Sequence, residues 1–332
     1  MNIPKVSILV PICNVEKYLT QCLNSLVSQT LQEIEIICIN DGSTDNSLQI
    51  INRFAAKDNR IVIIDKPNSG YGDSMNRGLE IAKGEYIGIV ESDDFADCDM
   101  FEQLYNLTDH GSIDIVRSNY YKYWDEKGDA DCYHAEIRSY GKIINLVQEK
   151  EILMVPPAIW ASIYRKKFLL DNKIRFLTTP GASYQDTSFF IKSLFMAKKL
   201  IYTENKYLHY RQDNASSSVK QCALAKVKFV HMEYNEADQY LKRFPERYAL
   251  IETIYNTKKL LTFFWNLYRV DDKKGYIKVM EEASREILCN NNYEKRYFSR
   301  PERIILNCLK RNSLHTVCFL LKVKKCKQAL FG

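Results

Sequence analysis

The sequence predicts an α/β fold in which a mostly parallel sheet carries helices on both faces. Over the first 110 residues, short β-branched apolar runs alternate with segments whose apolar positions recur every three or four residues. Turn residues such as Pro, Gly, Asn and Asp follow the apolar runs. Beyond Ser218 only the helical pattern continues. We therefore expect a sheet-based domain over residues 1–220 and a helical C-terminal region over residues 221–332.

The strands are expected where the apolar runs are short and bounded by turn residues. They are residues 6–10 (closed by Pro11), 34–39, 61–65 and 86–90. The helices between them are expected at residues 15–27, 47–56 and 75–83. Ligands bind at the carboxyl ends of parallel strands, so the loops that follow the strands should share one crevice. These loops are residues 11–14, 40–45 and 91–94.

Residues 113–220 show a mixed pattern rich in Tyr and Trp, and later segments have helical periodicity. The later helices are expected at residues 223–244, 249–268 and 275–288. No G-x-G-x-x-G follows the first expected strand, and no P-loop signature is present. The sequence therefore disfavours a dinucleotide cofactor and a P-loop.

The cysteine pattern indicates a reducing compartment. The ten cysteines are scattered without C-x-x-C spacing, so we expect reduced thiols that serve as small apolar side chains. The N-terminus enters a strand-like run directly, without the apolar core of a signal peptide. No run of about 18 apolar residues occurs. We expect the chain to stay in the cytosol.

Basic residues are concentrated at the C-terminal end. Residues 295–332 hold ten Lys and Arg residues against one acid, Glu302. In the segment 303–311, Ile304, Ile305, Cys308 and Leu309 share one helical face, and an apolar run at 317–321 precedes four further lysines. This pattern predicts an anionic membrane surface as partner. The alternative is a last helix packed on the domain with a solvated basic edge. Nucleic-acid binding is disfavoured, because no basic patch elsewhere interleaves with aromatic residues.

Two groups of acids follow expected strands. Glu91-Ser92-Asp93-Asp94 comes directly after the strand at 86–90, and carboxylates together with substrate phosphates are common ligands of Mg²⁺ and Mn²⁺. Asp41 and Asp45 bracket a Gly-Ser-Thr turn after the strand at 34–39. For both groups the alternative is helix capping, which also favours acids in the first turn.

Taken in order, these segments resemble the family 2 glycosyltransferases, which have the GT-A fold. The resemblance lies in residues 11–19 (PICNVEKYL), 28–30 (SQT), 40–45 (NDGSTD), 82–87 (AKGEYI) and 91–94 (ESDD). It covers about the first 110 residues. It implies that residues 1–110 bind a nucleotide-sugar, whereas residues 111–220 carry the acceptor site and the catalytic base. Residues 70–76 (GYGDSMN) are similar to a variant found among capsule and lipopolysaccharide enzymes.

The resemblance also implies roles for individual residues. Asp41 would recognise the uracil ring and Asp93 would bind Mn²⁺ or Mg²⁺. Glu91 stands where the family usually has Asp, so its carboxylate is one methylene longer. The residues expected to bind the donor nucleotide are Pro11, Cys13, Asn14, Glu16, Asp41, Asp73, Asn76, Glu91, Ser92, Asp93 and Arg211.

The second half should supply the base. Transfer with inversion needs a carboxylate that takes the acceptor proton, and Asp186 in a Gln-Asp pair is similar to a later signature of the family. The alternative is that Asp186 caps the helix expected at 187–198. His209 is expected to bind the metal and Arg211 the pyrophosphate, against a structural role for each. Trp160 and Gln185 are expected in the acceptor site, although a Trp is more often core.

These expectations define a specific hypothesis. The chain is an inverting glycosyltransferase that moves a hexose or N-acetylhexosamine from a UDP-sugar to a hydroxyl of a cell-surface glycan, free or lipid-linked, at the inner face of the cell membrane. Capsule and lipopolysaccharide are the glycans that the resemblance suggests. The alternatives are a nucleotidyltransferase on a similar sheet and a non-catalytic glycan-binding module at the membrane.

Overall fold

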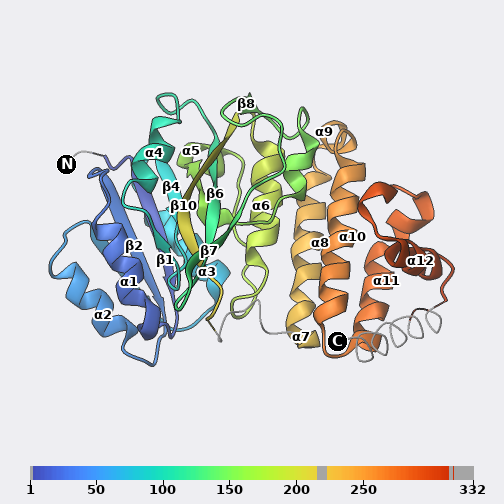
Figure 1. The fold of residues 1–332 in the computed structure, drawn as a ribbon, viewed down its shortest axis with the longest axis horizontal. Coiled ribbons are helices and arrows are strands. Elements are labelled where there is room, and N and C mark those ends of the chain that lie inside the picture. The colour runs from blue at the N-terminus through green and yellow to red at the C-terminus, as the bar shows by residue number, and fades with distance from the viewer. Residues whose placement is uncertain (1–2, 215–222, 314–316, 318–332) are drawn as a thin grey trace. The chain divides into compact units, whose positions relative to one another are not determined.

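The computed structural model describes residues 3–214, 223–313 and 317 (Figure 1). The chain divides into two compact units, residues 1–217 and 218–332. The sequence pattern had placed the corresponding boundary at residue 220.

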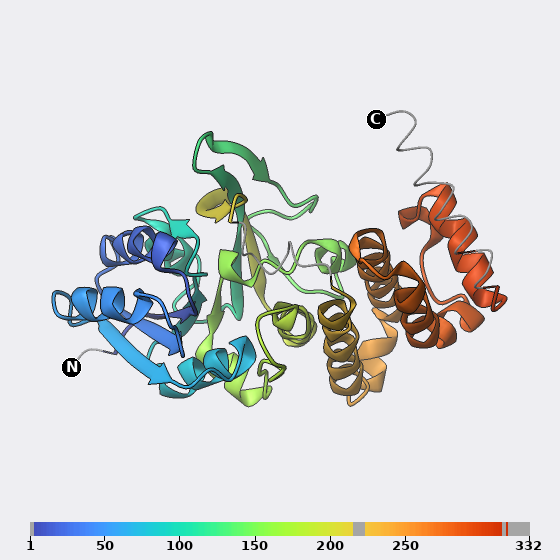
Figure 2. The ribbon, with the colours of Figure 1, turned by 90° about the horizontal axis from the view of Figure 1, so that it is seen from below.

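Unit 1 contains one sheet, to which ten of the described strands belong. Its first part is parallel in the order β3-β2-β1-β4. These strands are β1 (Val6–Ile12), β2 (Ile34–Asp41), β3 (Ile61–Lys66) and β4 (Tyr86–Ile89). The helices between them are α1 (Glu16–Val27), α2 (Ser47–Ala55) and α3 (Tyr71–Ile81). Figure 2 shows α3 on the opposite side of the sheet from α1 and α2. The predicted α/β class with helices on both faces is confirmed.

Strand β1 continues through Pro11, which the sequence pattern had taken as its end. Pro11 pairs with Ile39 of β2. On the other side, the pairing of β1 with β4 ends at Leu9, opposite Ile89. The carbonyl of Leu9 accepts a hydrogen bond from the N–H of Val90, on the side of β4. Backbone groups two residues apart on a strand face the same side, so the nitrogen of Pro11 also faces the side of β4, beyond the last paired residue. The missing N–H of Pro11 therefore removes no hydrogen bond from the sheet.

The second part of the sheet contains antiparallel strands. β9 (Ser162–Arg165) pairs antiparallel with both β4 and β6 (Ile115–Trp124). β10 (Leu200–Arg211) runs parallel to β6 and antiparallel to β5 (Phe95–Ala96). Two strands lie off this path, namely β7 (Gly128–Tyr133) on β6 and β8 (Ile143–Ile144) on β10. Because β9 joins β4 to β6, both halves of unit 1 share one continuous sheet.

Further helices complete unit 1. They are α4 (Met100–Asn106), α5 (Lys166–Asp171), α6 (Gln185–Met196) and the 3-10 helices η1 (Lys150–Met154) and η2 (Ile159–Ala161). Helix α6 begins at Gln185, two residues before its predicted start. Helix α3 begins at Tyr71, four residues before its predicted start. The Gly70-Tyr71-Gly72 segment resembles a loop in sequence, but the structure places it against the distant segment 177–181.

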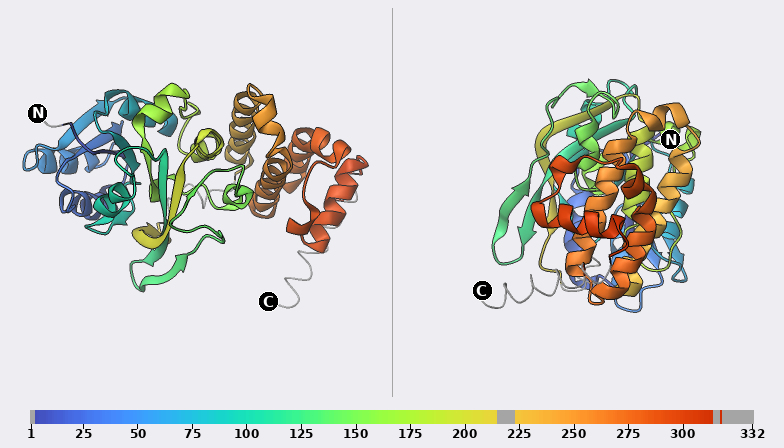
Figure 3. Two further views of the ribbon diagram at one scale, coloured as in Figure 1. Left: turned by 90° about the horizontal axis from the view of Figure 1, so that it is seen from above. Right: turned by 90° about the vertical axis from the view of Figure 1, so that its right-hand side faces the viewer.

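Unit 2 is helical in its described part (Figure 3). The segment predicted at 223–244 is divided into α7 (Leu224–Val227) and α8 (Phe229–Leu241). The segment predicted at 249–268 corresponds to α10 (Glu252–Arg269), and the short helix α9 (Pro245–Ala249) precedes it. The remaining elements are α11 (Lys273–Asn290), η4 (Lys295–Tyr297) and α12 (Arg300–Lys310). Within the described ranges, no helix is both long and apolar enough to cross a membrane.

Helix α12 corrects one prediction about the basic end. Ile305, Leu306 and Leu309 are buried, and α12 packs against α11. Ile304 alone among its large apolar residues is exposed, at 47%. The apolar face that was expected to lie on a membrane therefore packs within unit 2. This packing removes its apolar surface from water, which stabilises the unit. The predicted basic segment at 318–332 lies outside the described residues.

Candidate active site

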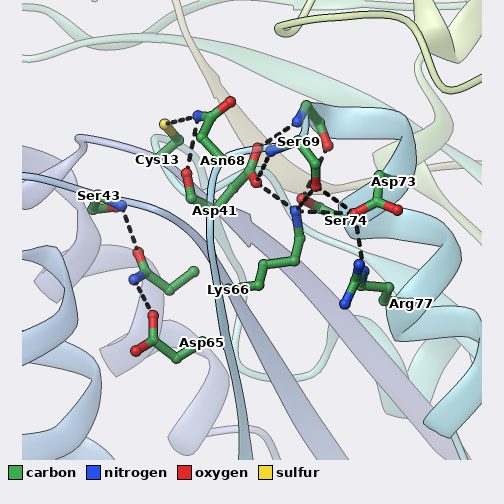
Figure 4. A network of polar contacts seen from close by, with 12 residues as sticks. Cys13, Asp41, Ser43, Asp65, Lys66, Asn68, Ser69, Asp73, Ser74 and Arg77 are labelled. Carbon is green, nitrogen blue, oxygen red and sulfur yellow. Dashed lines mark hydrogen bonds and ion pairs between the residues drawn. The ribbon is translucent and has the colours of Figure 1, made fainter.

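The carboxylate of Asp41 is fixed at the end of β2 by three donors (Figure 4). The ammonium group of Lys66 pairs with Oδ1 of Asp41, and both side chains are less than 8% exposed. The backbone N–H groups of Ser69 and Gly70 donate to Oδ1 and Oδ2, at 2.8 and 2.9 Å. Lys66 also pairs with Asp73 at 3.1 Å. A buried carboxylate held in this way presents a fixed acceptor edge.

Residues of the loop after β1 hold the loop after β2. The side chain of Asn14 accepts from the N–H of Thr44 at 2.8 Å. The carboxylate of Glu16 accepts from the N–H of Asn46 at 2.9 Å. The structure thus brings the two predicted loops together, with Pro11 buried beneath them. The contacts of Asn14 and Glu16 give them a role in fixing the loops, whereas their predicted donor contacts stay predictions.

Cys13 and Asn76 lie at the two sides of this region. Cys13 is exposed and its sulfur accepts from the Asn68 amide at 3.4 Å. Burial of the sulfur, with the charge of Asp41, raises the pKa of Cys13, so the thiol stays protonated. The side-chain amide of Asn76 donates to the carbonyl of Phe176 at 2.9 Å and accepts from its N–H at 3.0 Å. Asn76 therefore ties α3 to the second half of unit 1.

The acidic loop, residues 91–94, follows β4, and each of its three acids has a distinct partner. Oε1 of Glu91 accepts from the hydroxyl of Tyr71 at 2.7 Å. Oδ2 of Asp93 accepts from the Asn214 amide at 2.7 Å, and Oδ1 of Asp94 accepts from the backbone N–H of Arg211 at 2.9 Å. Ser92 is buried between them. The loop is therefore held by α3 on one side and by the end of β10 on the other.

Burial raises the pKa values of two of these acids, Glu91 and Asp94. Burial raises the pKa of Glu91 to about 8, and the charges of Asp93 and Asp186 act in the same direction. Burial and the neighbouring charge of Asp93 raise the pKa of Asp94 well above its usual range. Desolvation disfavours the charged form of a carboxyl group, and like charges add to this effect. Such perturbed groups are typical of functional sites.

Asp186 lies in the first turn of α6 and acts electrostatically on the same region. Burial is the main reason why the pKa values of Tyr71 and Tyr210 are raised, and the charge of Asp186 contributes to both. The charges of Glu91 and Asp93 act on Tyr210 as well. The structure therefore brings the predicted base into the neighbourhood of the predicted donor carboxylates.

Arg211 is buried and binds groups of the protein. Its Nε donates to the carbonyl of Asp93 at 2.8 Å, and Nη2 donates to Oε1 of Gln21 at 2.6 Å. Nη1 pairs with the Asp125 carboxylate, and the guanidinium lies over the ring of Tyr18 at 4.7 Å. The side chain is only 1% exposed. These contacts make Arg211 a support of the acidic loop; its predicted contact with a pyrophosphate stays a prediction.

His209 contacts side chains of the protein through both ring nitrogens, and its predicted role as a metal ligand stays a prediction. Nδ1 lies 2.8 Å from Oδ1 of Asp129, and Nε2 lies 3.0 Å from Oδ1 of Asp97. The ring is stacked between Phe95 at 4.3 Å and Tyr121 at 4.9 Å. Each ring nitrogen thus lies within hydrogen-bond distance of a carboxylate of the protein. His209 fastens β10 to β7 and to the segment after β5.

The two residues predicted to contact an acceptor are mostly buried. Trp160 is 9% exposed and stacks on Tyr210, with ring centroids 5.0 Å apart. Gln185 is 2% exposed; its amide donates to Thr179 Oγ1 at 2.7 Å, and its carbonyl oxygen accepts from the N–H of Ser183. Gln185 therefore orders its own loop, and Trp160 supports Tyr210, which borders the acids. Their predicted contacts with an acceptor stay predictions.

The acidic loop fits a divalent cation that also binds a diphosphate. Oδ2 of Asp94 is buried and has no hydrogen-bond partner within the described residues, and Asp93 has a second oxygen beside the one bound by Asn214. Across the described ranges, no group of three or more His, Cys, Asp and Glu side chains is arranged to hold a metal alone. Mg²⁺ is commonly held by one or two carboxylates plus substrate phosphates, and this donor set matches that pattern.

Sequence reasoning missed Tyr71, Tyr210, Asp94 and Asn214. Tyr210 could have been found from its position, because it stands between His209 and Arg211 in a strand and so points to the opposite face. Asp94 belongs to the acidic motif itself. Asn214 and Tyr71 carry no local signal, since their partners lie 121 and 20 residues away in the chain.

An α/β sheet with a fixed carboxylate at the end of β2, an acidic loop after β4 and an acid on α6 is the arrangement expected of a nucleotide-sugar transferase. The chain matches the family described as "Glycosyl transferase family 2" over residues 7–172. It belongs to that family and is a glycosyltransferase. This membership sets aside a non-catalytic glycan-binding module.

Individual relatives agree with this assignment. The chain is 32% identical over 222 residues to the glycosyltransferase GlyG of Streptococcus pneumoniae, covering 63% of this chain and 72% of GlyG. It is 30% identical over 262 residues to a glycosyltransferase of Haemophilus influenzae, covering 77% of this chain and 94% of the relative.

Solved structures show the same fold. The S. aureus TarS 1–349 structure in complex with UDP has a TM-score of 0.66 at 20% identity, covering 97% of this chain and 92% of that chain. The TarS complex with UDP-GlcNAc has a TM-score of 0.60 at 19% identity, covering 94% and 91%. The predicted GT-A architecture is thereby confirmed.

Proposed function

We propose that this enzyme is an inverting glycosyltransferase that moves a hexose or N-acetylhexosamine from a UDP-sugar to an acceptor hydroxyl. One observation carries the proposal. Tyr71 donates to Glu91 of the acidic loop at 2.7 Å, and its backbone N–H donates to the carbonyl of Gly181, five residues before Asp186, at 2.9 Å. This link between the acidic loop and the segment before Asp186 supports a base and a diphosphate-binding loop that serve one reaction. The TarS complexes with UDP and UDP-GlcNAc support the choice of a UDP-sugar.

Separate residues are proposed to bind the nucleotide and the metal. Asp41 offers a fixed acceptor edge for the N–H of a uracil ring, because Lys66 and two backbone N–H groups already hold its carboxylate. Asp93, with Asp94 beside it, would hold Mn²⁺ or Mg²⁺. When bound, such a cation neutralises charge that develops on a leaving diphosphate.

Asp186 is the proposed base. Its carboxylate takes the proton of the acceptor hydroxyl while the acceptor oxygen forms a bond to the anomeric carbon. The bond between the anomeric carbon and the diphosphate oxygen breaks, and UDP leaves with the electron pair. Attack from the face opposite to the diphosphate inverts the anomeric centre. General base catalysis of this kind contributes roughly 10²- to 10⁴-fold to the rate.

A donor panel tests the proposal. Purified protein is incubated with Mn²⁺ and UDP-Glc, UDP-Gal, UDP-GlcNAc or UDP-GalNAc, and UDP release and protection against heat are measured. We expect one donor to be hydrolysed and to protect, and Asp93→Ala to abolish metal-dependent release. Asp186→Asn should retain donor binding and lose transfer. Pyrophosphate release from UTP, with no turnover of any UDP-sugar, would favour a nucleotidyltransferase instead.

We further propose a cell-surface glycan, such as capsule or lipopolysaccharide, as the acceptor, held at the inner membrane face. The resemblance of residues 70–76 to capsule and lipopolysaccharide enzymes supports the glycan. For the membrane, the support is the charge of the last 15 residues, which include Lys322, Lys324, Lys325 and Lys327.

Membrane binding is tested without disturbing α12. Because α12 packs on α11, the chain is ended after residue 317 and compared with the full chain. We expect the full chain to bind vesicles with anionic lipid at low salt and the shortened chain to bind less. Replacing the four lysines by Gln gives the matched full-length variant. Equal binding of all three proteins would remove the membrane from the proposal.

A further inference from the structure

Tyr71 connects the acidic loop to the segment that leads into Asp186. It is the first residue of α3. Its hydroxyl donates to Oε1 of Glu91 at 2.7 Å, and its backbone N–H donates to the carbonyl of Gly181 at 2.9 Å. Gly181 stands five residues before Asp186 in the chain. One residue thus bonds to both sides of the proposed reaction centre.

The backbone on either side of Tyr71 leaves no free space against that segment. A Cβ atom added to Gly72 would lie 2.1 Å from the carbonyl oxygen of Leu177. A Cβ added to Gly70, where φ is 94°, would lie 2.8 Å from the carbonyl oxygen of Thr179. Both distances are too short for real atoms, so the two segments meet backbone to backbone. The spacing between α3 and the segment 177–181 is therefore fixed.

Aromatic packing fixes the ring of Tyr71 as well. The ring meets that of Phe176 edge-on at 5.9 Å, and Phe176 stacks on Phe189 at 4.1 Å. Phe189 belongs to α6, the helix that carries Asp186, and is completely buried. Edge-to-face and stacked pairs of this kind restrict ring orientation. The hydroxyl of Tyr71 is thus aimed at Glu91 by the helix of the proposed base.

The length of Glu91 suits this contact. An aspartate at this position would end one carbon–carbon bond, about 1.5 Å, short of the present carboxylate. The 2.7 Å bond to Tyr71 would then be lost unless the backbone moved. Within the described residues, no protein group donates to the second oxygen of Glu91. The longer acid therefore reaches Tyr71 with one oxygen and leaves the other for the reaction centre.

We propose that Tyr71 is a positioning residue that sets the spacing and orientation of Glu91 relative to Asp186. This inference rests on the proposed function for the role of Asp186. In this role Tyr71 acts through Glu91, without a contact of its own with donor or acceptor. Its loss should lower the rate of the chemical step and leave the binding of UDP unchanged.

Tyr71→Phe and Glu91→Asp test the proposal singly and together. Each should lower kcat by about ten- to a hundredfold, because leaving a buried acceptor without its donor has an effect of this size. The Kd for UDP, measured by calorimetry, should stay within about twofold. Since both changes break the same bond, the double variant should lose no more activity than the worse single variant.

The chain supplies a matched control at the other end of β4. Tyr105 donates to Oε2 of Glu85 at 2.7 Å, and this pair is also 20 residues apart. Glu85 stands just before β4, whereas Glu91 follows it. Tyr105→Phe removes a hydroxyl from the same kind of bond outside the site, and we expect unchanged kcat.

Thermal melting without substrate gives a second measurement. Tyr71→Phe and Glu91→Asp should each lower Tm by about 2–4 °C, and the shifts should not add in the double variant. A wild-type kcat for Tyr71→Phe, additive losses, or an equal loss in Tyr105→Phe would overturn the proposal. If the wild type turns over no UDP-sugar, the proposed function fails. Non-additive Tm shifts would in that case still support the hydrogen bond between Tyr71 and Glu91.

Discussion

The backbone N–H of Arg211 donates a hydrogen bond of 2.9 Å to Oδ1 of Asp94. The last residue of β10 thereby holds the last residue of the acidic loop, across 117 positions of the chain. The guanidinium of Arg211 adds a bond to the carbonyl of Asp93 and one to Gln21. The position of the proposed metal-binding carboxylates thus depends on a strand from the other half of unit 1.

Arg211→Lys should weaken metal binding more than donor binding. Lys keeps the charge but cannot reproduce the planar fork that reaches Asp93, Gln21 and Asp125 together. We expect the Mn²⁺ concentration for half-maximal activity to rise about tenfold or more. Arg60→Lys is the control, because Arg60 also binds a carboxylate and a carbonyl, those of Asp58 and Val27. An equal rise in that variant would contradict the local role of Arg211.

Lys66→Met should destabilise the enzyme by about 3–5 kcal/mol, the usual cost of leaving one partner of a buried ion pair unpaired. The carboxylate of Asp41 would remain buried with only two backbone donors. Chemical denaturation measures the change. The double variant Asp41→Asn with Lys66→Met should recover part of the lost stability because no unpaired charge remains, but it should not recover UDP binding. A double variant less stable than Lys66→Met would argue against charge as the cause.

Gly72→Ala should lower stability although Ala is the better helix former. Helix propensity alone predicts a gain of about 0.5–1 kcal/mol, whereas overpacking against Leu177 costs about 1–3 kcal/mol. We expect a lower Tm together with a lower kcat. Gly128→Ala serves for comparison: nothing lies within 4 Å of its added Cβ, so only its φ of 63° opposes the change. Stabilisation by Gly72→Ala would mean that the two segments can move apart.

His231 predicts a pH dependence of unit 2. Burial, with a smaller effect of Lys259, lowers the pKa of His231 to about 4, and neither ring nitrogen has a partner in the described part of the chain. The unfolded chain therefore binds a proton near pH 6.5 that the folded chain binds only near pH 4. Between these values, stability rises with pH, and about 3 kcal/mol is lost as pH falls through the window.

His231→Leu should flatten this dependence. The variant should be at least as stable as the wild type at pH 7, because an apolar side chain replaces an unpartnered polar ring among Phe263 and Tyr276. Denaturation is followed between pH 4 and 7. His110→Asn, at an exposed position, should keep the wild-type slope. An unchanged slope in His231→Leu would show that other groups cause the acid sensitivity.

The local signals in the sequence predicted the first half well. Strand patterns and turn residues are properties of neighbouring residues, so β1, β2 and β4 and their loops followed from the chain alone. The start of α3 did not, because Gly70 and Gly72 have their reason in a segment more than 100 residues away. Likewise, the bonds of His209 to Asp129 and Asp97 span 80 and 112 positions. The chemistry of the histidine side chain suggested a metal ligand, whereas its contacts with these two distant carboxylates appear only in the folded chain.

The continuous sheet of unit 1 limits how this enzyme can be recombined with its relatives. β4 pairs with β9 through Tyr86–Arg165 and Gly88–Ile163. Exchanging residues 111–217 as a block would therefore replace one strand of this hydrogen-bonded ladder, which lies in the middle of the core. Foreign strands would have to match its register as well as its side chains. A change of specificity is therefore more accessible by grafting short loop segments than by exchanging halves. A junction near residue 217, where the two units divide, leaves the ladder whole.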